Sequence, residues 1–331
     1  MASMPSASRV TQARPDELAT LAAMRHAEGW VVNRWLLDLL CQWPQARIGV
    51  VRDATTTTEH NSGHGSGTPR LLGTTVATAY GPLGFIGNVV VDPAARGRGY
   101  GKLLMRDAIA WLRGRGVRTV LLDATEDGRP LYRSLGFVGT THSWVVWQPL
   151  ADIALADGPL PAGTTVTSLA PARIARIGML DRAAFGGDRM GLLAAMLALP
   201  KTHGYVAEDA GGAVAGYLIA RPLEAPRAGI YLGPVVARSP EAARALVMAA
   251  ARHAREREPH ATTGAASICV AVPGSGTLAV EAYRSLGLNV LEDDLRMRLD
   301  LAPDGTGTPP HVERQAGQAE WAYGMLSPMV G

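Results

Sequence analysis

The spacing of apolar and polar residues changes several times along the first half of the chain. Apolar positions at helical spacing predict helices at residues 15–28, 35–42, 100–113 and 129–135. Shorter apolar runs between turn residues predict strands at residues 10–13, 48–51, 71–79, 85–91, 117–123 and 137–147. The run at 85–91 is nearly all apolar, so this strand is expected to be buried on both faces. Strands mixed with helices in this order predict a fold of the α/β (α+β) class.

The second half of the chain repeats landmarks of the first. Tyr-Arg-Ser-Leu-Gly occurs at Tyr132–Gly136 and again at Tyr283–Gly287. A valine pair precedes a helix in both halves, at Val90-Val91 and at Val235-Val236. Two copies with a domain-sized period indicate a tandem duplication rather than a solenoid.

The length of 331 residues agrees with two domains, each large enough to bury its own core. A hydrophobic fraction of 47% excludes a disordered or fibrous chain. The stretch that follows the first copy contains Pro-Leu-Pro-Ala-Gly and is the best candidate for a linker. We therefore expect domains at residues 1–148 and 166–331, joined by a linker at residues 149–165.

Composition also restricts the partners and the location. No apolar run reaches the ~18 residues of a membrane span, and the first residues lack the apolar stretch of a secretory signal. We therefore expect a cytoplasmic protein without a membrane partner, either a monomer or a homodimer. Cys41 and Cys269 lie far apart and lack the spacing of metal ligands, so neither a disulfide nor a metal site is expected.

Positive charge is dispersed along the chain and is densest at one place. The net charge is +3, and no run of lysine and arginine resembles a nucleic-acid-binding patch. The densest cationic stretch contains Arg96, Arg98, Lys102 and Arg106 and surrounds a run of glycines. This arrangement predicts a small polyanionic ligand and no nucleic-acid partner.

The same stretch has the sequence Val89-Val-Val-Asp-Pro-Ala-Ala-Arg-Gly-Arg-Gly-Tyr-Gly-Lys102, in which a buried strand leads through glycines into a helix. Backbone N–H groups and the helix dipole favour phosphate at such a turn, and glycines permit close approach. A dinucleotide-binding fingerprint would need glycine at Lys102, and a Walker A loop would need Ser or Thr at Leu103. Neither of these phosphate loops is therefore expected.

The run Arg96-Gly-Arg-Gly-Tyr-Gly101 resembles the acyl-CoA pyrophosphate loop of the GNAT N-acetyltransferase superfamily. Tyr132-x-x-x-Gly136-Phe137 is similar to a second motif of that superfamily, and the resemblance covers roughly residues 8–147. It implies tandem GNAT folds, each a mixed, mostly antiparallel sheet flanked by helices, and acetyl-CoA as the cofactor. The residues that the resemblance assigns to CoA are Val89, Val91, Arg96, Gly97, Arg98, Gly99, Tyr100, Gly101 and Lys102.

The resemblance also implies direct transfer of an acetyl group to a small-molecule primary amine. Backbone N–H groups at Val89 to Val91 would bind pantetheine and stabilise the oxyanion, and Tyr132 would protonate the thiolate. Some members of the family carry a glutamate base eleven residues before the loop, where this chain has Phe85. A base must therefore come from elsewhere or act through water. The candidates for contact with the substrate are Glu28, Trp30, Asp123 and Glu126.

The second copy is expected to be degenerate. Shifting the loop by the offset of the valine pairs places it on Glu241–Leu246, which contains no glycine and has glutamate in place of Arg96. The order of an active domain followed by a degenerate one resembles two-domain bacterial acetyltransferases. Two other functions stay open: acetylation of a protein or peptide amine, and a non-catalytic acyl-CoA-binding sensor or assembly module.

Overall fold

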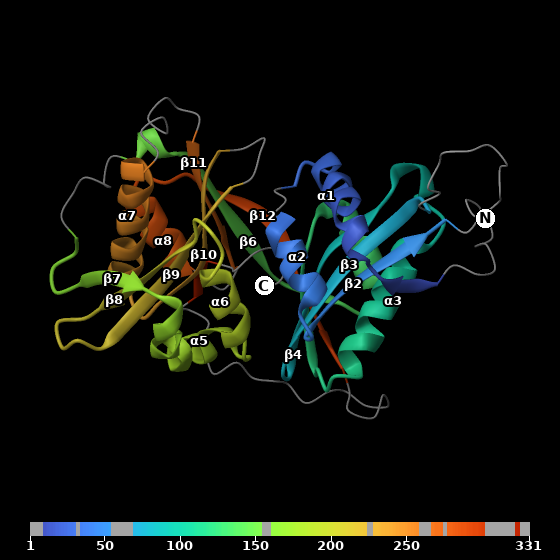
Figure 1. The fold of residues 1–331 in the computed structure, drawn as a ribbon, viewed down its shortest axis with the longest axis horizontal. Coiled ribbons are helices and arrows are strands. Elements are labelled where there is room, and N and C mark those ends of the chain that lie inside the picture. The colour runs from blue at the N-terminus through green and yellow to red at the C-terminus, as the bar shows by residue number, and fades with distance from the viewer. Residues whose placement is uncertain are drawn as a thin grey trace. The chain divides into compact units, whose positions relative to one another are not determined.

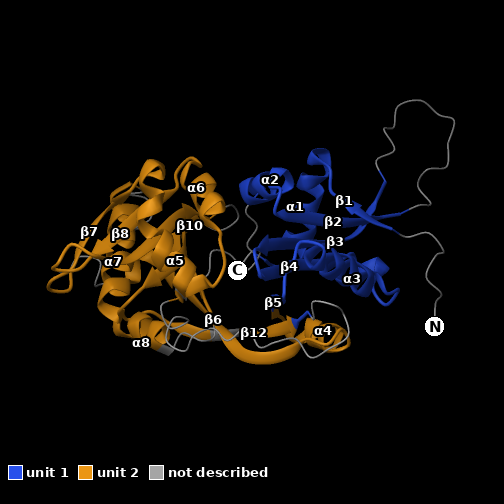
Figure 2. Ribbon diagram, turned by 90° about the horizontal axis from the view of Figure 1, so that it is seen from below, with its two compact units in different colours: residues 1–122, 300–309, 330 blue, residues 123–299, 310–329, 331 orange. Residues whose placement is uncertain are grey.

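The computed structural model describes residues 9–30, 34–53, 69–153, 160–223, 228–257, 266–273, 277–301 and 322–324. It contains two compact units (Figures 1 and 2). Unit 1 comprises residues 1–122, 300–309 and 330, and unit 2 comprises the remainder. No helix in the described part of the chain is long and apolar enough to cross a membrane.

Unit 1 is built on a sheet with the strand order β1-β2-β3-β4-β5. Its strands are β1 (Val10–Gln12), β2 (Ala46–Arg52), β3 (Leu71–Tyr80), β4 (Leu83–Val91) and β5 (Thr119–Ala124), the last of which runs into unit 2. The first four strands pair antiparallel, whereas β4 and β5 pair parallel. The sheet is therefore mixed and mostly antiparallel.

Helices cover both faces of this sheet. The helices are α1 (Leu18–Ala27), α2 (Arg34–Gln42) and α3 (Tyr100–Arg113). α1 and α2 lie on one face and α3 lies on the other (Figure 2). Leu104 of α3 packs in an apolar cluster that includes Leu72, as expected from the apolar stripe of this helix.

In unit 2 the strand order is β12-β6-β11-β10-β9-β8-β7, and β13 pairs with β10. Its strands are β6 (Val138–Pro149), β7 (Thr165–Leu169), β8 (His203–Glu208), β9 (Val214–Pro222), β10 (Ala228–Ala237), β11 (Ala266–Val272), β12 (Val290–Asp300) and β13 (Ala322–Gly324). Its helices are α4 (Arg129–Arg133), α5 (Gly178–Phe185), α6 (Met190–Leu197), α7 (Pro240–Arg257) and α8 (Thr277–Ser285). β10 and β11 pair parallel, as β4 and β5 do in unit 1. This matching parallel pair of strands supports the duplication inferred from the sequence.

The repeated Tyr-Arg-Ser-Leu-Gly forms the same turn in both places. The Phe137 N–H donates to the Tyr132 carbonyl at 3.1 Å, and the Leu288 N–H donates to the Tyr283 carbonyl at 3.1 Å. The glycine between them has a positive φ in both turns, +91° at Gly136 and +73° at Gly287. These contacts form the helix C-cap that glycine favours, which explains why this part of the repeat is so similar.

The division into compact units differs from the domain boundaries expected from the sequence. Residues 123–149 belong to unit 2, because β6 pairs with β11 and with β12. The long strand β6 therefore carries the end of the first copy and also serves the sheet of the second. The linker expected at 149–165 includes residues 154–159, which lie outside the described residues.

Candidate functional site

The turn between β4 and α3 is shaped by two glycines and one carboxylate. Gly97 and Gly99 have φ values of +75° and +83°, a region that other residues adopt only at a cost. A Cβ added at Gly97 would meet nothing within 4 Å, so the turn faces open space. Asp92 accepts hydrogen bonds from Ala94 N–H at 2.9 Å and from Arg70 at 2.7 Å, which fixes the start of the turn. The hydrogen bond from Arg70 holds the pKa of Asp92 below its usual range.

Six consecutive backbone donors are free at this turn. None of the N–H groups from Gly97 to Lys102 has an acceptor within the described part of the chain. Gly99 is the N-cap of α3 and supplies no side-chain cap, so the first turn of the helix keeps its unpaired donors. Unpaired donors and the positive end of the helix dipole together form a cradle with the features that suit an anion.

The cations of the turn divide into two groups. Arg98 and Lys102 have no ion-pair partner among the described residues, so they can meet an anion. Arg96 instead points back to the sheet: its Nε donates to the Val91 carbonyl at 3.1 Å, and its Nη2 pairs with Glu28. The side chain of Arg96 therefore anchors the loop to β4 and to the end of α1.

Strand β4 offers an open edge next to this cradle. β4 pairs with β5 only over Leu83–Phe85, so the later residues of β4 have no strand partner on that side in the described structure. A bulge shifts the pairing of β4 with β3, and Asn88 within it has a φ of +54°. Val89 to Val91 therefore present an edge without a strand partner, on which the Val91 carbonyl accepts from Arg96, and this edge can accept an extended chain bearing amide groups.

Three other residues predicted for the site lie in unit 1 and differ in their burial and in their hydrogen-bond partners. Tyr100 is 2% exposed and packs in the apolar cluster with Leu104, so only its backbone can serve a ligand. Glu28 lies at the C-cap of α1 and is held by Arg96. The half-buried Trp30 donates its backbone N–H to the Arg25 carbonyl at 3.3 Å. Glu28 thus lies beside the loop, but its carboxylate is already paired.

Arg25 was missed by sequence reasoning as a functional candidate and is the most unusual side chain of unit 1. It is fully buried, and its Nη2 donates to Thr74 Oγ1 at a long 3.4 Å. Its Nε and Nη1 have no partner among the described residues. Burial lowers the pKa of Arg25 to about 9. The signal was present in the sequence, because Arg25 falls on the same helical face as Leu18 and Leu21.

Three predicted residues belong to unit 2. Tyr132 lies in α4, is 8% exposed and packs edge-to-face on Phe137. Burial, with a contribution from Asp294, raises the pKa of Tyr132 to about 12, so its hydroxyl keeps its proton. Asp123 is bound by Arg296, whose Nη2 donates to Oδ2 at 2.8 Å, while Glu126 is exposed. The lone pairs that Asp123 would use as a base are therefore already engaged.

Between β10 and α7, all of whose residues are described, the second unit has no counterpart of the glycine turn. Residues 241–246, onto which the sequence offset placed the loop, lie inside α7, so that alignment is wrong. Only Arg238 and Ser239 join β10 to α7, and Ser239 Oγ accepts the Ala242 N–H at 3.2 Å. The connection is therefore too short to hold such a loop, and a serine caps the helix in place of the open donors.

Family models of known proteins match both copies of the fold. Residues 29–137 match the family described as "Acetyltransferase (GNAT) family", and residues 177–299 match the "Acetyltransferase (GNAT) domain". Glucosamine 6-phosphate N-acetyltransferase of Trypanosoma brucei brucei is 34% identical over 122 residues, which are 37% of this chain and 68% of that enzyme. Other curated relatives are matched over 19–35% of their own length.

Solved structures share the fold over most of the chain. A putative acetyltransferase from Pyrococcus horikoshii aligns with a TM-score of 0.67 and 19% identity, covering 100% of this chain and 98% of that one. A tandem GNAT protein from the clavulanic acid biosynthesis pathway aligns with a TM-score of 0.62 and 17% identity, covering 89% and 98%. At these identities the likeness shows the fold alone.

Proposed function

The chain belongs to the GNAT family of acetyltransferases, and from this premise we propose that it acetylates the primary amine of a small molecule. Acetyl-CoA is the acetyl donor, as throughout the family. The observation that carries the proposal is the row of unpaired N–H groups from Gly97 to Lys102 beside the open edge of β4. A relative of known activity, the trypanosomal enzyme, acts on a phosphorylated amino sugar by its name, which supports a small acceptor.

In this proposal the pyrophosphate of CoA binds the N–H groups of residues 97–102, and Arg98 and Lys102 add positive charge. The amides of the pantetheine arm pair with the free edge at Val89 to Val91. The acetyl carbonyl then lies beside β4, where a backbone N–H can stabilise the oxyanion. The substitution of positive-φ glycines would remove this fit, because a side chain would occupy the space of the phosphate.

The chemistry requires two proton transfers. The amine loses a proton and attacks the thioester carbon, so that a C–N bond forms and the C–S bond breaks. We assign the proton delivered to the departing thiolate to Tyr132, whose raised pKa of about 12 keeps it protonated. The amine proton passes to water, or to Glu28 once its pairing with Arg96 is released.

We further propose that only the first copy binds acetyl-CoA. The second copy lacks the glycine turn, and the corresponding edge of β10 is already paired with β13 through Val235 and Val236. A second donor site would need both features.

A free-thiol assay with acetyl-CoA and a panel of amines tests the proposed acceptor class. The panel contains glucosamine 6-phosphate and other small primary amines, a peptide with a free N-terminus and a lysine-containing peptide with a blocked one. We expect thiol release with at least one small amine and none with either peptide. Release with the peptides alone, or no release with any amine, would overturn the proposal.

A further inference from the structure

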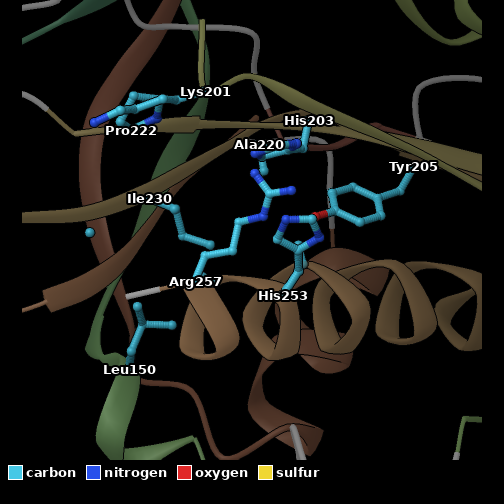
Figure 3. Close-up of a pocket in the computed structure, with 12 residues that line it drawn as sticks. Leu150, Lys201, His203, Tyr205, Ala220, Pro222, Ile230, His253 and Arg257 are labelled. Atoms are coloured by element: carbon cyan, nitrogen blue, oxygen red, sulfur yellow. The ribbon is translucent and has the colours of Figure 1, made fainter. Parts of the chain in front are cut away.

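A cavity lies within unit 2, along the C-terminal half of α7. Its volume is about 280 Å³, close to the lower end of ligand pockets, which start at roughly 300 Å³. His253 and Arg257 extend from α7 toward the strands that carry His203 and Tyr205 (Figure 3). The glycine turn belongs to the other unit, so this cavity is not part of the acetyl-CoA cradle.

The lining of the cavity has an apolar part and a basic part. Leu150, Ile230 and several alanines form the apolar part. The polar part consists of Lys201, His203, Tyr205, His253 and Arg257. No carboxylate is among the described residues that line it, although Glu256, next to Arg257 on α7, acts electrostatically on His253 and Tyr205.

The two histidines of the cavity lie against each other and beside Tyr205. Their ring centroids lie 4.5 Å apart, and the ring of Tyr205 meets that of His253 edge-on at 6.0 Å. The Nε2 atom of His253 is buried and has no hydrogen-bond partner in the described structure. Burial lowers the pKa of both histidines, and the positive charge of Arg257 lowers it further. An anion between these groups would give the Nε2 atom of His253 a hydrogen-bond partner. Its negative charge would also offset the positive charge of Arg257.

Lys201 adds a backbone feature to the same cavity. It precedes β8 with a φ of +58°, a conformation that costs a non-glycine residue about 1 kcal/mol. This turn keeps a lysine at the mouth of the cavity where glycine or asparagine would be less strained.

We propose that this cavity binds a small organic anion, a carboxylate or phosphate monoester, whose apolar or ring portion packs on Leu150 and Ile230. Arg257 and Lys201 neutralise the anionic group, and the imidazoles of His203 and His253 hydrogen-bond to it. The site is independent of acetyl-CoA, because it uses none of the residues of the glycine turn. Fewer than three metal-ligating side chains gather in any one place of the described structure, so the lining suits an anion better than a metal ion.

A purely structural role gives a different expectation for the same residues. Arg257 ends α7, where a cation is favoured by the negative end of the helix dipole. If this were its whole role, its removal would lower the melting temperature without affecting any ligand.

Calorimetric titration of the full chain with phenyl phosphate tests the proposal, with uncharged phenol as the reference probe. With the glycine turn filled by saturating CoA, we expect one phenyl phosphate per chain with a Kd of about millimolar, and no saturable binding of phenol. R257Q should weaken the phosphate ester about tenfold or more, because it removes the charged donor. R252Q is the matched control: Arg252 lies on α7 outside the cavity, and this variant should bind as the wild type does.

The variant G99E separates this site from the glycine turn of unit 1. Phenyl phosphate should still bind to G99E, whereas acetyl-CoA should not. Loss of phenyl phosphate binding in G99E would assign the anion to the turn and overturn the proposal. Equal weakening by R257Q and R252Q, an effect of R257Q on melting alone, or no saturable binding in the wild type would also overturn it.

Discussion

The two copies of the fold differ most where a strand passes into the following long helix. In unit 1 residues 92–99 join β4 to α3 and include Gly97 and Gly99 in left-handed conformations. In unit 2 the connection from β10 to α7 is reduced to Arg238 and Ser239. The helix that follows is long in both copies, so packing on the sheet does not require the loop. We therefore propose that the loop serves ligand binding and not the fold.

The edges of the strands that precede these connections, β4 and β10, also differ between the two copies. The edge of β4 beyond Phe85 is open, whereas β10 continues past its pairing with β11 and takes β13 as an antiparallel partner at Val235 and Val236. A strand edge left open must be protected or used. In unit 2 the chain covers the edge with its own residues, and in unit 1 we propose that the edge is used for pantetheine.

The largest expected effect comes from breaking the glycine turn. G99E places a side chain with negative charge at a φ of +83° in the cradle, and we expect acetyl-CoA to bind about 1000-fold more weakly, or about 4 kcal/mol. G116E is the control, because Gly116 also has a positive φ, +76°, and open space at its Cβ but lies at the other end of α3. Calorimetry that shows the same affinity for G99E and wild type would contradict the cradle.

The repeated tyrosines permit a matched comparison of the chemical step. Y132F removes the proposed proton donor, and kcat should fall about 100-fold. Y283F removes the hydroxyl from the corresponding residue of the second copy, which is fully buried, and kcat should stay unchanged. Because the pKa of Tyr132 is raised to about 12, the wild-type rate should not fall between pH 8 and pH 10 through loss of this proton. Equal rates of Y132F and wild type in the thiol assay would exclude Tyr132 as the acid.

The buried guanidinium of unit 1 should cost stability. The pKa of Arg25 falls from 12.5 to about 9 on burial, so the folded state holds this proton less tightly than the unfolded state does. The penalty is present at neutral pH and is relieved as the pH rises through about 9. R25M should therefore raise the free energy of unfolding by about 1–3 kcal/mol.

Chemical denaturation measures this effect, with R113M on the exposed side of α3 as the control. Substitution of an exposed arginine should change the free energy of unfolding by less than about 0.5 kcal/mol. A clear loss of stability in R25M would mean that Arg25 has stabilising partners.

The smallest expected effect is at the covered edge of unit 2. A322P removes a backbone N–H from the strand that pairs with Val236, and unit 2 should lose about 1 kcal/mol of stability. A322S keeps the N–H and should leave stability nearly unchanged. A322P should not create a second acetyl-CoA site, because opening the edge does not restore the glycine turn. A second site in this variant would show that β13 alone blocks the second copy.

Local features were predictable from the sequence because they depend on local spacing. The bounds of α3, the strand before the turn and the positive-φ glycines all follow from residues within a short window. The pairing of Glu28 with Arg96 was not predictable, because 68 residues separate them and only the packing of α1 beside the loop brings them together.

The short connection between β10 and α7 in the second copy was not predictable for a related reason. A fixed sequence offset aligned the loop with the first turns of α7. The residues found there contain no glycine, and such a sequence is compatible both with a loop whose glycines have been replaced and with a helix. The placement of β13 on β10 likewise joins residues far apart in the chain. Such contacts depend on the register of the sheet, which sequence periodicity does not determine.

The number of acetyl-CoA molecules bound per chain tests the central difference between the copies most directly. Calorimetric titration of the full chain should give one site, and that site should disappear in G99E. Two sites of similar affinity, or one site that survives in G99E, would contradict the account.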